Sequence, residues 1–239
     1  MTELTRRSRK AARGPAIVAR LLDEYAGGVV ELRWSTPFEL LVATILSAQS
    51  TDRKVNEITR TLFAKYPGPA DYLAVDEEEL QDDIRQSGFF RQKAKSIRGM
   101  CRALLTEHDG RVPLRMADLV RLPGVARKTA NVVLGAVAPA AHVADPEAGI
   151  AVDTHVKRLS RRLGLTRHTD PVRIERDLMA VLPREQWPSA SLVIILHGRR
   201  VCDARRPRCT ECVVEELCPS SLAAGCADRA GQAVGLGEP

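Results

Sequence analysis

Apolar residues recur at helical spacing along most of the chain. The run Ala94, Ile97, Cys101 and Leu104 is typical, because residues three and four positions apart lie on one face of a helix. No stretch alternates apolar and polar residues as a half-buried strand would. Helices are expected over about 15–25, 36–49, 52–66, 76–87, 91–107, 127–137 and 154–163, from Pro171 onward, and over 188–198. The pattern therefore predicts an all-α protein.

Three segments lack this pattern. Residues 1–14 are basic and we expect a disordered arm, while residues 220–239 are rich in Ala, Gly and Ser and predict a disordered tail. The Ala/Pro-rich connection 138–149 is expected to be an exposed loop.

The stretch LPGVARKTANVVL, residues 122–134, predicts a tight turn that leads into a helix. Pro123 and Gly124 break the incoming helix, and apolar spacing resumes after Arg127. A Gly-containing turn before a helix N-terminus directs free amides at one point, which suits a phosphate group. Lys128 lies in the first turn, where the helix dipole disfavours an ammonium, so it is a candidate amine nucleophile. The alternative is a structural corner with a surface lysine.

Charge and composition narrow the class of partner. The chain has 239 residues, a formal net charge of +6 and 4% aromatic residues. The basic excess favours a polyanion, and so few aromatic residues disfavour recognition through rows of stacked rings. No apolar run is long enough to span a membrane, and the basic N-terminus lacks the apolar core of a signal peptide. We therefore expect a cytoplasmic protein.

Four of the six cysteines, Cys202, Cys209, Cys212 and Cys218, form the pattern C-x6-C-x2-C-x5-C. Thiolates this close in sequence can converge on zinc or an iron–sulfur cluster. Zinc usually takes two close pairs, whereas only one close pair occurs here, which favours a cluster. Reduced thiols without metal are the alternative. Cys101 lies on an apolar helical face and predicts core packing, and Cys226 has no assigned partner.

The hairpin, the later AVDTH at residues 151–155, and LHGR followed by the four cysteines occur in one order. Together they resemble the endonuclease III family of DNA glycosylases in the helix-hairpin-helix superfamily, over residues 16–219. The resemblance implies a six-helix barrel over residues 30–147 and an iron–sulfur domain over residues 15–29 plus 148–219, with a DNA-binding cleft between them. It also implies a 4Fe–4S cluster on the four cysteines.

By the same resemblance Lys128 corresponds to the catalytic lysine and Asp153 to the catalytic aspartate. The implied activity removes oxidised pyrimidines from duplex DNA and nicks the abasic site by β-elimination through a lysine Schiff base. The resemblance also implies a monomeric enzyme that does not bind a membrane. The chemistry suits the residues: a carboxylate stabilises an oxocarbenium-like state, and a neutral amine attacks C1′. By itself, Asp153 before Thr154 would be an ordinary helix cap.

A glycosylase extrudes the damaged nucleotide and fills the space it leaves. Gln49 matches the family's gap-filling glutamine, and Phe89 matches the position of an apolar wedge. A polar helix end and a partly buried loop aromatic are the structural alternatives. Gly124, Ala126 and Arg127 are the expected hairpin contacts to DNA. Ala126 replaces a second glycine, and its amide remains usable only if its φ suits a side chain.

Two other functions fit parts of the pattern. A monofunctional adenine-mismatch glycosylase shares the cysteines and the aspartate but lacks the lysine nucleophile. A non-catalytic DNA-binding protein would use the hairpin, show steep salt dependence and leave abasic DNA intact.

Overall fold

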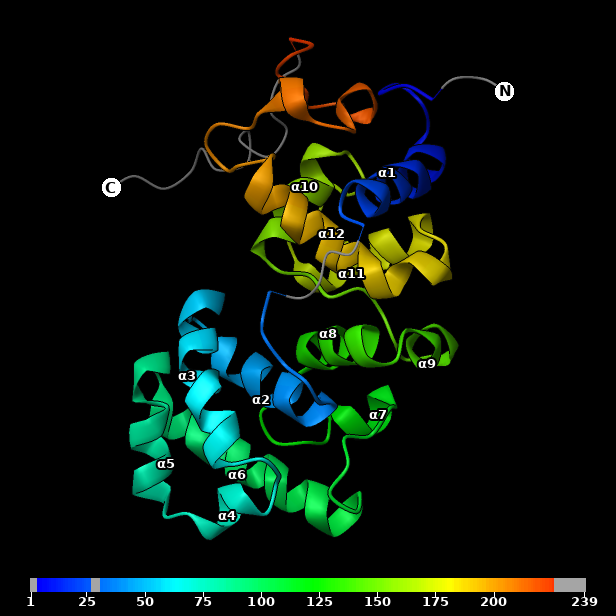
Figure 1. The fold of residues 1–239 in the computed structure, drawn as a ribbon. Coiled ribbons are helices and arrows are strands. Elements are labelled where there is room, and N and C mark those ends of the chain that lie inside the picture. Colours follow the sequence, from blue (N-terminus) through cyan, green and yellow to red (C-terminus); the bar gives the residue numbers. More distant parts are fainter. Residues whose placement is uncertain (1–3, 27–30, 226–239) are drawn as a thin grey trace. The chain divides into compact units, whose positions relative to one another are not determined.

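The computed structural model describes residues 4–26 and 31–225, and all regular structure in these residues is helical (Figure 1). The α-helices are α1 (Lys10–Glu24), α2 (Pro37–Ser47), α3 (Asp52–Lys65), α4 (Asp71–Ala74), α5 (Glu77–Asp83), α6 (Phe90–Glu107), α7 (Met116–Leu119), α8 (Arg127–Val137), α9 (Pro139–Ala144), α10 (Thr154–Arg162), α11 (Pro171–Val181) and α12 (Trp187–Arg200). Four 3₁₀ turns are η1 (Arg85–Ser87), η2 (Arg184–Gln186), η3 (Cys209–Glu211) and η4 (Glu215–Leu217). The expected all-α class is confirmed.

The chain forms two compact units. Residues 30–148 make one unit, here called the inserted unit. Residues 1–29 and 149–239 make the other, the terminal unit, which is built from both ends of the sequence. Each unit has its own apolar core.

The inserted unit is organised around α2. Thr36 caps this helix by accepting a bond from the Glu39 amide at 3.2 Å, and the Glu39 carboxylate accepts one from the Ser35 amide at 2.5 Å. Pro37 occupies the first helical position, where its missing N–H costs nothing. Helix α2 packs against α3, α6 and α8. The face expected from the spacing of Ala94 to Leu104 is fully buried in this core.

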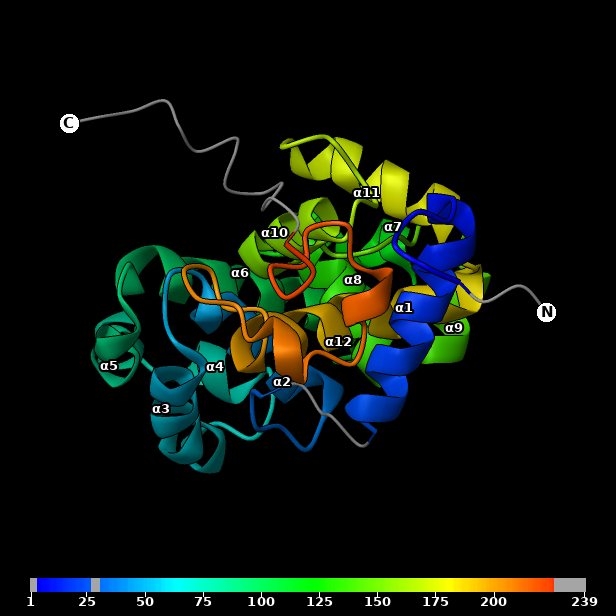
Figure 2. The same ribbon diagram turned by 90° about the horizontal axis from the view of Figure 1, so that it is seen from above.

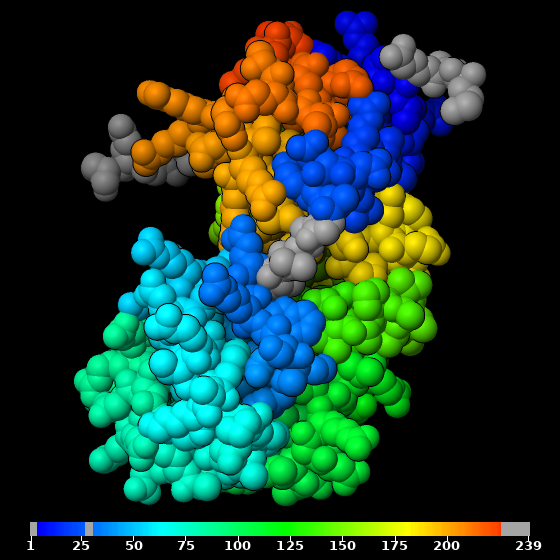
Figure 3. Space-filling view, in the orientation of Figure 1, coloured from blue at the N-terminus to red at the C-terminus, as the bar shows by residue number. Residues whose placement is uncertain are grey.

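In the terminal unit, α1 packs against α11 and α12 (Figure 2). Ile17, Val18 and Leu21 are fully buried there. The space-filling view shows the two ends of the sequence, blue and orange to red, side by side on one surface of this unit (Figure 3). Among the described residues, no helix is long and apolar enough to cross a membrane.

The expected disordered arm and tail are too long. Helix α1 begins at Lys10, because Arg13 is buried and donates to the carbonyls of Leu163 at 2.9 Å and Leu217 at 2.6 Å. At the other end, Ser220 and Ser221 are buried. The rest of the expected tail, including Cys226, lies outside the described residues.

The expected exposed loop 138–149 was also wrong. Residues 139–144 form α9, with Pro139 at the first helical position, and His142 is buried. Alanine is the strongest helix former, and here it outweighs the loop signal of the prolines. Helix α3 is capped by Thr51, whose side chain accepts a hydrogen bond from the Lys54 amide at 3.3 Å.

Candidate active site and cysteine cluster

The hairpin of residues 120–126 joins α7 to α8. Its apolar residues Leu122 and Val125 are buried, and the Val125 amide donates to the Leu122 carbonyl at 3.0 Å, which closes the turn. Gly124 has a φ of 81°, a conformation that side chains strain to adopt. A Cβ at Gly124 would lie 2.7 Å from the Cβ of Ser96 on α6, so the turn also needs glycine for space.

The N-terminus of α8 has no side-chain cap. Within the described chain, the amides of Gly124, Ala126 and Lys128 donate to no protein acceptor. Such a group of amides at the positive end of a helix is suited to an anion. Lys128 is exposed in the first turn of α8, beside these amides. Arg127 is also exposed, and its Nη1 donates to the Glu147 carbonyl at 2.7 Å.

Ala126 has a φ of −82° and a ψ of 165°. This is extended backbone that any L-residue adopts, so the alanine in place of a second glycine causes no strain. Its amide therefore remains as available as a glycine's would be.

Asp153 is the N-cap of α10. Its Oδ1 accepts a hydrogen bond from the Val156 amide at 2.8 Å, and the side chain is half-buried. Asp153 therefore serves as a helix cap, which is the structural role that its sequence context suggests. A cap bond occupies one oxygen of a carboxylate that has about four acceptor positions, so capping and a second role are compatible.

Gln49 and Phe89 share an unusual backbone conformation. Gln49 has a φ of 54° and Phe89 a φ of 49°, and among the described non-glycine residues only Asp109 joins them at positive φ. Both side chains are exposed, and Phe89 is 67% accessible, which excludes the alternative of a partly buried loop aromatic. Strained backbone of this kind is concentrated at functional sites.

The four cysteines of the C-terminal pattern are free thiols that line one cavity of the terminal unit. Within the described residues, no three His, Cys, Asp or Glu side chains converge closely enough to hold a single metal ion. Four thiols around one space are donors of the type that zinc and iron–sulfur clusters take.

Side chains of neighbouring helices fix this cysteine loop. Arg162 donates to Cys202 Sγ at 3.5 Å and to the carbonyls of Asp203 at 2.6 Å and Ala204 at 2.8 Å. His197 Nε2 lies 3.3 Å from Cys212 Sγ, and its Nδ1 lies 2.9 Å from the Tyr25 hydroxyl.

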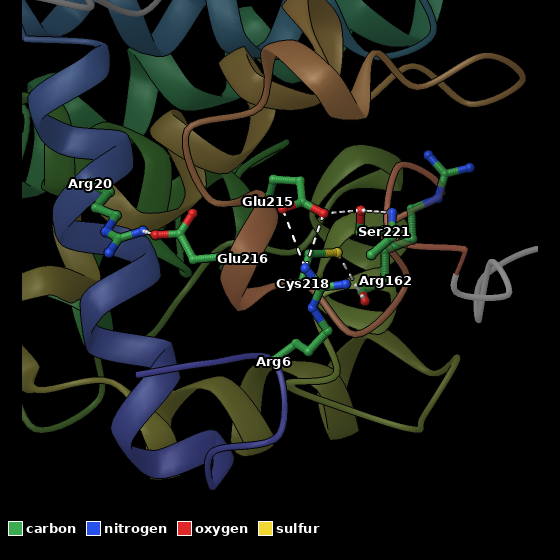
Figure 4. Close-up of polar contacts among 8 residues, drawn as sticks. Arg6, Arg20, Arg162, Glu215, Glu216, Cys218 and Ser221 are labelled. Carbon is green, nitrogen blue, oxygen red and sulfur yellow. Dashed lines mark hydrogen bonds and ion pairs between the residues drawn. The ribbon is translucent and has the colours of Figure 1, made fainter. Parts of the chain in front are cut away.

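Near Cys218, Glu215 pairs with Arg6 and accepts a hydrogen bond from Ser221, while the Cys218 thiol faces the Arg162 carbonyl at 3.7 Å (Figure 4). A second ion pair joins Arg20 of α1 to Glu216. The loop is thereby held from both ends of the sequence.

Burial favours the protonated form of the Cys202, Cys212 and Cys218 thiols when no cation is bound. It raises the pKa of Cys212 to about 11 and that of Cys218 to about 12, and it also raises the pKa of Cys202. A bound metal reverses this balance, because its charge stabilises the thiolate form. Cys101 differs: it is fully buried in the inserted unit and packs in its core, as the sequence predicted.

The residues that support the site carry no distinctive pattern in the sequence. Lys93, Arg162 and His197 are all buried polar side chains whose bonds reach segments distant in sequence. The surrounding sequence reads as an ordinary amphipathic helix in each case, so only the fold shows their partners.

Comparison with known proteins gives consistent matches. Residues 42–184 match the family model described as HhH-GPD superfamily base excision DNA repair protein. The chain is 51% identical to endonuclease III of Synechocystis over 93% of its length and all of the relative's. It is 47% identical to endonuclease III of Bacillus subtilis, covering 82% of this chain and 87% of that one.

Among solved structures, a trapped covalent intermediate of endonuclease III with DNA matches with a TM-score of 0.80 and 39% identity. That match covers 91% of this chain and 100% of the other. A thermostable thymine-DNA glycosylase at 20% identity has a TM-score of 0.75 and shares the fold.

Proposed function

Because the chain belongs to the endonuclease III family of the HhH-GPD superfamily, whose members are DNA glycosylases and abasic-site lyases of base excision repair, we propose that Lys128 and Asp153 carry this chemistry on duplex DNA. The observation that carries the proposal is the position of Lys128. An exposed amine lies beside backbone amides that donate to no acceptor among the described residues, so a bound phosphodiester would place a sugar next to it.

Lys128 acts as the nucleophile in this proposal. Its neutral amine forms a bond to C1′ as the bond from C1′ to the base breaks, and the proton that the amine loses balances the one that the base takes up. Opening of the sugar gives an iminium. The iminium acidifies the C2′ proton, whose loss expels the 3′ phosphate, and hydrolysis of the product imine frees the lysine.

Asp153 stabilises positive charge on the sugar while the base leaves. Its carboxylate remains an acceptor after capping α10, and a fixed negative charge favours an oxocarbenium-like state more than the ground state. The cap bond also fixes the orientation of the carboxyl group, which an uncapped side chain would have to lose entropy to adopt.

Gln49 and Phe89 are proposed to occupy the space left by the extruded nucleotide and to separate the neighbouring bases. An exposed phenyl ring on a strained loop is costly in water and suits insertion between bases. Gly124, Ala126 and Arg127 would hold the phosphate backbone at the N-terminus of α8.

We propose a 4Fe–4S cluster on Cys202, Cys209, Cys212 and Cys218. Four thiols around one cavity support a thiolate-bound group, and the single close pair in C-x6-C-x2-C-x5-C favours the cluster over zinc. When bound, the cluster supplies four iron–thiolate bonds that cross-link the C-terminal loop. Iron and sulfide analysis, with visible absorption of the purified protein, tests the assignment. Zinc at one ion per chain would contradict it.

Oxidised pyrimidines are the proposed lesions, and the enzyme would work as a monomer in the bacterial cytoplasm, where the chromosome lies. Relatives named endonuclease III support the substrate class.

Borohydride trapping tests the nucleophile. The protein is incubated with one duplex that contains thymine glycol and another that contains an abasic site, and the Schiff base is reduced to a stable complex. We expect a covalent complex on both duplexes. Lys128→Ala should abolish it while retaining duplex binding, and Lys95→Ala, which removes an exposed lysine of α6, should leave it unchanged.

Each other result has a defined meaning. A complex on the abasic duplex alone would retain the lyase and refute the oxidised-pyrimidine assignment. Undiminished trapping by Lys128→Ala would refute the nucleophile. No complex on either duplex, with DNA binding intact, would indicate a non-catalytic binding protein.

A further inference from the structure

Gln49 and Phe89 lie on two loops forty residues apart in sequence, and one buried lysine connects these loops. We propose that Lys93 is a positioning residue that fixes the two DNA-inserting loops relative to each other. The inference rests on the roles proposed above for Gln49 and Phe89. Lys93 itself would not contact DNA, because the residue is only 5% exposed.

The contacts of Lys93 are specific to these loops. Its Nζ donates to the Leu46 carbonyl at 2.8 Å and to the Ser87 carbonyl at 2.7 Å. Leu46 is in the last turn of α2, three residues before Gln49, and Ser87 ends η1, two residues before Phe89. The Lys93 amide also donates to the Phe89 carbonyl at 3.1 Å, so this residue holds the second loop twice.

Both carbonyls depend on this lysine. Within the described chain, no amide donates to the carbonyl of Leu46 or of Ser87, and both residues are buried. A buried carbonyl without a hydrogen-bond partner is costly. The chain turns away after Leu46 and after Ser87, so no described backbone amide reaches either carbonyl, and the Lys93 ammonium takes the place of those donors. No described carboxylate pairs with Lys93 either, so its charge is directed to the two loops.

The cost of this arrangement supports a functional reason for it. Burial lowers the pKa of Lys93 and thus opposes its charged form. Beside it, Gln49 and Phe89 both adopt the left-handed conformation, which is strained for a non-glycine residue. A buried cation and two strained residues within one small region are expensive for stability alone. The buried cation and the strained residues are explained if DNA insertion requires this geometry of the two loops.

The substitution Lys93→Met keeps an unbranched side chain that is one atom shorter and removes its donors. The first readout is a fluorescent adenine analogue opposite the lesion, whose signal rises when the lesion's partner is unstacked by insertion. The second is borohydride trapping on an abasic duplex, compared with trapping on an abasic single strand, which offers no stacked pair to wedge apart. Lys95→Met, on the same helix but exposed, removes an equal charge and is the matched control.

We expect Lys93→Met to lower the fluorescence rise and the duplex trapping rate about tenfold, through loss of two charge-assisted hydrogen bonds. Single-strand trapping should stay within about twofold, because the nucleophile on α8 is untouched. A general loss of folded structure would lower both rates together. Lys93→Gln, whose shorter side chain keeps a neutral amide donor group, should give an intermediate duplex defect and serves as the test if Lys93→Met does not fold.

Two reference variants separate the inference from the function it rests on. Gln49→Ala and Phe89→Ala should each lower the fluorescence rise. If neither does, the roles proposed for these two residues are wrong whatever Lys93 does. If both do and the Lys93 variants match Lys95→Met, the positioning role of Lys93 is refuted.

Discussion

Replacement of Gly124 by alanine should destabilise the inserted unit strongly. At a φ of 81° an alanine costs about 1–2 kcal/mol relative to its ordinary conformations. The added Cβ would also lie 2.7 Å from the Cβ of Ser96, a backbone-anchored atom that cannot rotate away. Overpacking of this kind costs about 1–3 kcal/mol. The expected loss in free energy of unfolding is therefore about 2–5 kcal/mol.

The two contributions can be separated by a second substitution. Ser96→Gly removes the clashing atoms and leaves the backbone of residue 124 unchanged. The double variant should recover the packing part, about 1–3 kcal/mol, and retain the conformational part. Glycine within α6 has its own cost, which the single variant Ser96→Gly measures.

The assay uses the two tryptophans of the chain, one in each unit. Trp34 packs on the core of the inserted unit, and Trp187 is buried in the terminal unit. In a Trp187→Phe background, urea unfolding followed by fluorescence reports the inserted unit alone. A change below about 0.5 kcal/mol for Gly124→Ala would refute the left-handed assignment, since surface substitutions already reach that value. Absence of coupling with Ser96 would refute the steric part.

The neighbouring position supplies the opposite control. Ala126→Gly should lower stability by about 0.4–1 kcal/mol, because it adds only freedom to the unfolded chain. Duplex binding should not improve, since the extended backbone of Ala126 already leaves its amide available. Tighter binding by this variant would show that the alanine does impair the hairpin.

Three further predictions concern single side chains. Asp153→Asn should keep the cap of α10 and the melting temperature while slowing base removal in single-turnover assays. Asp153→Ala should slow base removal and also lose about 1 kcal/mol of stability, because the cap bond is lost. Equal base removal by the aspartate and asparagine forms would contradict the electrostatic role. Cys218→Ala, or removal of iron by a chelator, should destabilise the terminal unit while Trp34 fluorescence reports an unchanged inserted unit. A single unfolding transition shared by the two units would argue against a local cluster. Burial alone would raise the pKa of Asp145, but hydrogen bonds from the amides of Met116 and Glu147 hold this pKa below its usual value. The ionised carboxylate therefore stabilises the fold fully above the ordinary carboxyl pKa. This stabilisation is lost as the pH falls through the lowered pKa of the folded protein. Thermal unfolding of Asp145→Asn and the parent should therefore converge below about pH 4, and a constant difference down to acid would refute this.

Local signals in the sequence predicted most helices. Thr36, Asp153 and Asp170 cap the helices that the sequence predicted over 36–49, over 154–163 and from Pro171 onward, and the hairpin turns at Pro123 and Gly124. These signals succeed because a cap or a turn involves residues within four positions of each other.

Longer-range bonds could not be predicted in this way. The burial of Arg13 depends on carbonyls 150 and 204 residues away, so the start of α1 reads from sequence as a basic tail. The same holds for Lys93, whose spacing fits the polar face of a helix. Its role emerges only when α6 is packed beside the end of α2.

The discontinuous terminal unit imposes an order on biosynthesis. Helix α1 leaves the ribosome first, yet its partners α11 and α12 are made only after the entire inserted unit. At about 5–20 residues per second, its apolar face waits roughly 10–30 s for them. During that time the inserted unit has its complete sequence and can fold, whereas nascent α1 must be shielded from aggregation or remain unstructured. The proposed cluster could be loaded only later still, once Cys218 has emerged. A chain stalled before that residue therefore has a complete inserted unit attached to an incomplete terminal unit.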